Sequence, residues 1–199
     1  MKSKSIKRNR NSSKAFTLVE LLIAISILSI SILATFTAVS NNLRSSNFAE
    51  DQVVAYYLAD EGIEYVRNVR DQNGIANIVA FGSGGAPVSW LDGISQFCIT
   101  TACAVDSPHP SPAQPIASCS GDASTCPYLL IDCPSITGSC VGRSGLYGYT
   151  AGWTPTQFKR SIKVNVTSAT EAVVASTVSW VTNGVSKSYT LSDILRAWQ

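Results

Sequence analysis

The chain has 199 residues, enough for one ordinary domain with an extension, and 45% of them are hydrophobic while only 14% are charged. This balance excludes a disordered chain, which requires low hydrophobicity together with high net charge. The net charge of +2 conceals an asymmetry, because six of the 15 basic residues lie in the first fourteen positions. The rest of the chain has 9 basic and 13 acidic residues, so a basic surface for nucleic acid is not expected.

A long apolar segment follows the basic N-terminus. Residues 16–39 contain one charged side chain, Glu20, and residues 21–39 contain none. As a helix these 24 residues would measure about 36 Å, which is sufficient to cross a bilayer core of about 30 Å. A secretory signal peptide would have a shorter apolar core and a small-residue cleavage site after it. The segment therefore predicts a single membrane-spanning helix, and the basic residues before it predict a cytoplasmic N-terminus.

The junction Lys14-Ala15-Phe16-Thr17-Leu18-Val19-Glu20 resembles the processing site of type IV prepilins and of type II secretion pseudopilins. In that family a short basic leader is removed just before a Phe, which is then N-methylated, and a Glu stands at the fifth mature position. The resemblance implies cleavage between Ala15 and Phe16, methylation of Phe16 and an assembly role for Glu20. One departure is Ala15, since a Gly usually precedes the cut. The alternative is a plain signal anchor that spans the membrane and does nothing else.

The predicted helix continues beyond the membrane, from about Phe16 to Gln72. Its second half has apolar residues at spacings of three and four, and most of its charged residues lie on the other side. The apolar positions are Ala55, Leu58, Gly62, Ile63, Val66 and Val69. The sequence Gln72-Asn73-Gly74 predicts the end of the helix. Asp60, Glu61 and Glu64 are interpreted as a solvated helix face rather than as catalytic carboxylates.

Residues 55–71 resemble the corresponding part of the helix in PilV-type minor pilins, and residues 156–162 resemble the start of the first C-terminal strand in those proteins. Major pilins often have a proline in the second half of the membrane segment, whereas residues 30–39 contain none. The resemblance therefore favours a minor pilin over a major subunit.

The remaining chain predicts β-structure. Residues 97–101 and 128–132 are candidate strands, and residues 160–167 alternate apolar and polar side chains. A hairpin is predicted from residues 172–181, through Asn183-Gly184, to residues 185–191. The fold class is therefore α+β, a long helix packed on an antiparallel sheet, as in the pilin fold. The expected parts begin with a cleaved leader over residues 1–15 and the membrane and assembly half of the helix over residues 16–39. The amphipathic half of the helix follows over residues 40–73. A β-rich globular domain is expected over residues 74–199, in which residues 82–85 form a flexible connection.

Six cysteines lie within 43 residues, at positions Cys98, Cys103, Cys119, Cys126, Cys133 and Cys140. An even number in an exported chain favours disulfides over free thiols. Zinc is disfavoured because no Cys-x-x-Cys pair exists and the single histidine, His109, lies among prolines. Pairing in sequence order, 98 with 103, 119 with 126 and 133 with 140, is the first expectation among 15 possible connectivities.

Enzymatic motifs are absent from the sequence. It has no phosphate-binding loop, no Gly-x-Ser-x-Gly elbow and no plausible Ser-His-Asp triad, so we expect a protein that is not an enzyme and has no cofactor or metal. The aromatic residues Tyr147, Tyr149 and Trp153 are interpreted as packing residues rather than as a stacking surface.

The leading hypothesis is a minor pilin of a type IV pilus. Its expected partners are other pilins through the N-terminal helix, the prepilin peptidase and methyltransferase, the inner-membrane assembly platform, and lipid before assembly. Its expected location is the inner membrane and then the cell-surface pilus. The alternatives are a secretion pseudopilin, a membrane-anchored enzyme, and a competence-type pilin that binds DNA. A DNA-binding surface would have to be built from Arg143, Lys159, Arg160 and Lys163.

Overall fold

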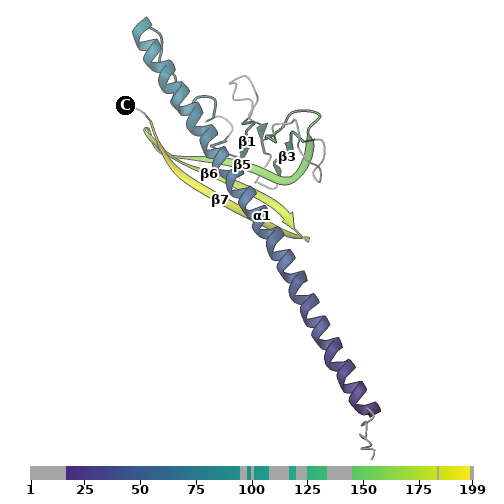
Figure 1. Ribbon diagram of the computed structural model, residues 1–199. Coiled ribbons are helices and arrows are strands. Elements are labelled where there is room, and N and C mark those ends of the chain that lie inside the picture. The colour runs from purple at the N-terminus through teal and green to yellow at the C-terminus, as the bar shows by residue number, and fades with distance from the viewer. Residues whose placement is uncertain are drawn as a thin grey trace, which may run out of the picture. The chain divides into compact units, whose positions relative to one another are not determined.

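The computed structural model describes residues 17–94, 98–99, 101–107, 117–119, 125–133, 145–182 and 184–197. It contains one long helix and seven strands (Figure 1). The elements are α1 (Leu18–Ser83), β1 (Cys103–Ala104), β2 (Ala117–Ser118), β3 (Tyr128–Ile131), β4 (Tyr147–Gly148), β5 (Thr154–Ser168), β6 (Glu171–Thr182) and β7 (Val185–Arg196). The chain divides into two compact units, residues 1–47 and residues 48–199, and the boundary between them falls inside α1. We call residues 48–199 the head. The α+β class is confirmed.

The strands of the head form an antiparallel sheet. Strand β5 pairs with β6 along most of its length, and it also pairs with β1 and β3; β2 and β4 extend the sheet from these short strands. Strands β6 and β7 form the predicted hairpin, with Thr182 opposite Val185 at its end. Gly184 has a φ of +76°, a left-handed conformation that glycine adopts without a steric penalty. Asn183, the other expected turn residue, lies outside the described residues.

The predicted strand over residues 128–132 is confirmed as β3, whereas the one over 97–101 is wrong for its described members, Cys98, Ile99 and Thr101. The backbone N–H of Cys98 donates to the carbonyl oxygen of Ile94 at 3.2 Å, as in a helical turn. The strand forms later, at β1. A short apolar run does not by itself distinguish a strand from a buried turn.

Within the head, α1 packs on the sheet through the face that its periodicity predicted (Figure 1). The buried helix residues are Ala55, Leu58, Ala59, Gly62, Ile63, Tyr65 and Val66. Ala55, Leu58 and Ala59 belong to one apolar cluster and Tyr65 and Val66 to a second, and both clusters also contain inward-facing residues of β5 and β6. Between the two clusters Gly62 allows the closest approach: a Cβ atom there would lie 2.5 Å from the hydroxyl oxygen of Ser176. The core of the head is therefore a helix face against a sheet face.

The predicted helix end at Gln72-Asn73-Gly74 is wrong, because α1 continues to Ser83. Gly84 has a φ of +73°, and the N–H of Gly85 donates to the carbonyl oxygen of Ala80 at 2.8 Å. This is the hydrogen bond of a glycine-terminated helix end. Residues 74–83, expected in the β-rich domain, are thus helical, and the expected flexible connection over residues 82–85 instead closes the helix.

Side chains on α1 fix the segment that follows its end. Asn77 donates to the carbonyl oxygen of Val88 at 2.9 Å and accepts from the N–H of the same residue at 2.7 Å. Asn73 donates to the carbonyl oxygens of Trp90 and Asp92. These contacts satisfy the hydrogen-bonding needs of backbone groups in the segment that follows α1. Asn73, which was expected near the helix end, therefore lies within the helix and binds the chain that returns along it.

Candidate assembly site

Glu20 lies in the first turn of α1 and takes part in its N-terminal cap. The N–H of Glu20 donates to the hydroxyl oxygen of Thr17 at 3.3 Å, and the N–H of Leu21 donates to the carbonyl oxygen of Thr17 at 3.2 Å. A Thr followed three residues later by a Glu is the pattern of a capping box. Our sequence interpretation assigned Glu20 to assembly and missed this local role, which the Thr-x-x-Glu spacing could have revealed. The expected cleavage and methylation residues, Ala15 and Phe16, lie outside the described residues.

The helix surface beyond Glu20 is apolar and exposed. In the described part of the chain, α1 is the one helix long and apolar enough to cross a membrane, and none of its most apolar 18-residue window is buried. Every hydroxyl group between residues 18 and 39 donates to a carbonyl oxygen three or four residues earlier; these are Ser26, Ser29, Ser31, Thr35 and Thr37. The segment therefore presents hydrocarbon with its hydrogen bonds satisfied internally, which suits contact with lipid or with other apolar helices.

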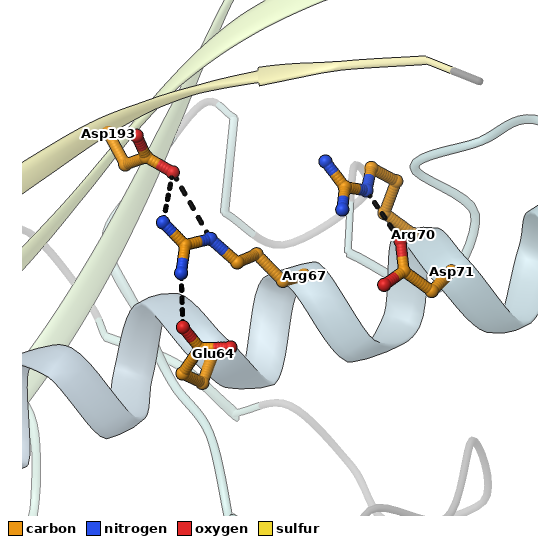
Figure 2. Close-up of polar contacts among 5 residues, drawn as sticks. All are labelled: Glu64, Arg67, Arg70, Asp71 and Asp193. Carbon is orange, nitrogen blue, oxygen red and sulfur yellow. Dashed lines mark hydrogen bonds and ion pairs between the residues drawn. The ribbon is translucent and has the colours of Figure 1, made fainter.

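On the head, charged residues of α1 connect the helix to strand β7 (Figure 2). Arg67 donates to Oδ2 of Asp193 from Nη2 at 2.7 Å and from Nε at 3.2 Å, and it also pairs with Glu64. The hydrogen bond with Asp193 is the largest cause of the raised pKa of Arg67. Arg70 and Asp71 form a neighbouring pair at 2.7 Å. Arg67 therefore links the helix to the last strand, while Glu64 is exposed, as expected.

Arg160 corrects two further expectations. Its side chain is fully buried, and it donates to the carbonyl oxygens of Leu58 at 3.1 Å and Val105 at 3.0 Å and to the hydroxyl oxygen of Ser107 at 2.8 Å. Its Nη1 also lies 3.1 Å from Oε2 of Glu61. Arg160 is therefore not a surface cation, and Glu61 is the counter-charge of a buried guanidinium rather than a purely solvated carboxylate.

The other candidates for a basic surface are Lys159, Lys163 and Arg143. Lys163 is exposed, whereas the ammonium group of Lys159 lies 4.5 Å from the ring centroid of Tyr128, a cation–π distance. Arg143 lies outside the described residues. Tyr147 and Tyr149 pack against the apolar clusters of the head, as the packing interpretation expected.

Tyr149 offers a test of the electrostatics next to Arg160. Its hydroxyl is buried and finds no hydrogen-bond partner among the described residues, and burial, as the largest cause, raises its pKa to about 12. Because this pKa lies above the value of an unfolded tyrosine, the group contributes stability that is complete below pH 10 and is lost between about pH 10 and 12. We expect Tyr149→Phe to change the free energy of unfolding by less than about 1 kcal/mol at pH 7. Between pH 10 and 12 the free energy of unfolding of the variant should fall by roughly 2–3 kcal/mol less than that of the wild type. Urea unfolding of both proteins across this range would measure the difference, and equal alkaline slopes would contradict the expectation.

Two disulfides fasten the short strands to the core. Cys98 is joined to Cys103 with Cα atoms 5.0 Å apart, and Cys119 to Cys126 with Cα atoms 4.8 Å apart. These are two of the three pairs expected from sequence order. Cys133 is also disulfide-bonded, and its expected partner Cys140 lies outside the described residues. No group of three or more His, Cys, Asp or Glu side chains within the described ranges is arranged to hold a metal ion.

Comparison with known families identifies the N-terminal segment. Residues 10–36 match the model described as the prokaryotic N-terminal methylation motif, and this range contains Ala15, Phe16 and Glu20. No curated protein and no solved structure matches the chain. Together with the exposed apolar helix and the disulfide-containing α+β head, the motif supports a type IV pilin-like or pseudopilin-like protein and implies processing at the N-terminus.

Proposed function

We propose that the chain is a minor pilin, a structural subunit without catalytic activity that joins a type IV pilus or primes its assembly. The observation that carries the proposal is the methylation motif over residues 10–36, which includes the start of an exposed apolar helix with Glu20 in its first turn. The resemblance of residues 55–71 and 156–162 to PilV-type minor pilins favours this subunit over a secretion pseudopilin, which shares the same N-terminal motif.

The proposed path begins in the inner membrane, with the N-terminus in the cytoplasm. A prepilin peptidase removes residues 1–15, a methyltransferase modifies Phe16, and the assembly platform transfers the apolar helix from lipid to a bundle of neighbouring pilin helices. Transfer between these two environments requires a helix surface that is apolar all round, as residues 21–39 provide.

The DNA-binding alternative loses support from the position of Arg160. A strand alternates its side chains between two faces, so Arg160 points inward with Phe158 and Ile162, all of which are buried. Of the four candidate cations, the structure describes three, and only Lys159 and Lys163 of these three lie at the surface. The burial of Arg160 lowers the number of phosphates that this surface could contact, and with it the expected affinity for DNA.

Processing gives the first test of the proposal. We expect the N-terminal peptide of the protein from native membranes to begin at methylated Phe16, because a small residue, Ala15, precedes an apolar one at the junction. Mass spectrometry would identify this peptide. Ala15→Leu should block the cut by placing a bulky side chain at the cleavage site, whereas Ala15→Gly should be processed at least as well as the wild type. An intact Met1 in assembled filaments would contradict the proposed site.

The location of the mature protein separates the pilin from the pseudopilin. Filaments sheared from the cell surface should contain the chain as a minor component, detected by mass spectrometry and by antibody labelling along or at the end of the fibre. A chain confined to the cell envelope, whose deletion abolishes secretion of exoproteins and leaves the pili unchanged, would overturn the minor-pilin assignment in favour of a pseudopilin.

A further inference from the structure

Arg44 is the first charged residue after Glu20 on α1, since residues 21–43 contain no charged side chain. It is exposed and follows the apolar run by five residues. The nearest acidic residue after it is Glu50, six residues further, whereas ion pairs along a helix form at separations of three or four. Among the residues that the structure describes, none forms a hydrogen bond or an ion pair with the side chain of Arg44. The described chain therefore supplies no counter-charge for this cation.

The spacing of Glu20 and Arg44 matches the thickness of a bilayer. The two residues are 24 positions apart on one helix, a separation of about 36 Å along its axis. The hydrocarbon core of a bilayer is about 30 Å thick, and the headgroup layers extend it to about 40–45 Å. A helix tilt of about 20°, the average for membrane helices, shortens the separation only to about 34 Å. When residues 21–39 fill the core, Glu20 and Arg44 therefore both fall within headgroup layers, one on each side.

The segment around Arg44 suits an anionic ligand. Six of the eight residues 40–47 are Ser or Asn and none is acidic, so no carboxylate in this segment would repel an anion. A guanidinium group presents a planar fork of N–H donors, which binds a phosphate through two parallel hydrogen bonds. In the headgroup layer that Arg44 reaches, the phosphate groups of phospholipids are the abundant anions. Charge and position therefore both favour a lipid phosphate as the partner of Arg44.

We propose that Arg44 binds the phosphate group of a phospholipid in the leaflet farther from residue 16, and that this contact fixes the depth of α1 in the membrane. Sliding of the helix in one direction would carry Arg44 into hydrocarbon, and sliding in the other would carry Glu20 into it; a charge in hydrocarbon is unfavourable in both cases. The junction of Ala15 and Phe16 is thereby held at a constant level beside the opposite surface. This last step rests on the proposed function, because it is a peptidase at that surface that must reach the junction.

Solid-state NMR of the full chain in vesicles of phosphatidylglycerol and phosphatidylcholine tests the contact itself. In phosphate-free buffer the lipid is the only source of phosphorus, and with ¹³C-labelled arginine part of the dephasing of the guanidinium carbons by ³¹P should come from Arg44. Arg44→Gln should remove this part. Arg196→Gln is the matched control, because Arg196 is an exposed arginine on β7 that pairs with Glu171, and it should leave the dephasing unchanged. Equal dephasing in Arg44→Gln and the wild type would overturn the inference.

The rate of processing in cells tests whether the contact fixes the depth of the helix. Gln, Lys and Arg have similar helix propensities, so Arg44→Gln and Arg44→Lys should both preserve α1. We expect Arg44→Gln to lower the initial rate of cleavage between Ala15 and Phe16 by about threefold or more, and Arg44→Lys, which keeps a cation, to stay within about twofold of the wild type. Equal rates in Arg44→Gln and the wild type, or equal losses in both variants, would overturn the positioning role. Absence of cleavage in the wild type would instead refute the proposed processing, and the vesicle measurement would still decide the lipid contact.

Discussion

Replacing Glu20 by Val is expected to leave membrane insertion and cleavage between Ala15 and Phe16 largely intact and to lower incorporation into filaments by roughly tenfold or more. In a membrane-resident monomer Glu20, about 3 Å along the helix axis from the first helical residue Leu18, would lie near the hydrated headgroups, and the helix dipole favours an anion there by about 0.3–1 kcal/mol. In a bundle of packed helices the same carboxylate would lose its water, and an unpaired buried charge is strongly unfavourable.

A cation must therefore accompany Glu20 in the assembled state. Residues 21–39 contain no charged side chain, and the α-amine that the proposed cleavage would create on Phe16 is four residues before Glu20 in the sequence. The amine of a neighbouring subunit can meet the carboxylate only when the two helices adopt one axial offset. Such a pair would make the register of assembly specific, a role that buried charged or polar groups have in other helix bundles.

The cap at Thr17 provides matched controls for this prediction. Glu20→Gln retains a residue that can complete a capping box but removes the charge, so it should fail in assembly nearly as strongly as Glu20→Val. Thr17→Val removes the cap, at a cost of about 0.5–2 kcal/mol to the helix end, and retains the charge, so it should assemble much better than either Glu20 variant. Incorporation would be measured in competition with the wild type. Efficient assembly of Glu20→Gln would show that Glu20 acts through the cap rather than through a charge pair.

Sequence patterns predicted the elements whose signals are local. Apolar residues at spacings of three and four identified the buried face of α1, because a helix brings such positions onto one side regardless of the rest of the fold. The Asn-Gly pair between two β-rich runs predicted the β6–β7 hairpin, whose turn needs a left-handed residue such as Gly184. Both predictions depend on geometry within a few residues, which is why they needed no knowledge of the tertiary structure.

The errors arose where distant residues decide the outcome. Gly74 was a reasonable helix end by itself, but Asn73 and Asn77 obtain partners in residues 88–92, and these contacts stabilise the longer helix. The alternation of side chains along β5 is sufficient to predict that Arg160 points inward. Its acceptors could not be predicted in the same way, because Leu58 and Val105 lie 102 and 55 residues away in the chain. The signal in the sequence is a charged residue, Arg160, at a strand position that alternation places inward. A search for the counter-charge of such a residue could have identified the pair with Glu61.

The pair of Arg160 and Glu61 is expected to control the stability of the head. Glu61 retains contact with water, since about a third of its side chain is exposed, whereas Arg160 is fully buried. Glu61→Gln would leave a buried guanidinium without its counter-charge, for which we expect a loss of about 2–3 kcal/mol, somewhat below the range for a fully buried pair. Arg160→Met removes the charge and fills similar space, but it leaves the carbonyl oxygen of Val105 without this donor, and we expect a loss of about 2–4 kcal/mol.

The double variant distinguishes a charge-pair effect from general damage to the core. Once Arg160 has been replaced by Met, removing the charge of Glu61 exposes no buried cation, so Glu61→Gln should then cost almost nothing. The sum of the losses in free energy of unfolding of the two single variants should therefore exceed the loss of the double variant by at least about 1.5 kcal/mol. Glu64→Gln is the matched control, because Glu64 is exposed on the same helix and its partner Arg67 keeps Asp193, so its loss should stay below about 0.5 kcal/mol. Urea unfolding of the mature chain in detergent micelles, with the disulfides oxidised and tryptophan fluorescence as the probe, would give the free energies of unfolding of the wild type and of the four variants. Additive losses for Glu61 and Arg160 would mean that the two charges are not coupled and that Arg160 is held by its hydrogen bonds to Leu58, Val105 and Ser107.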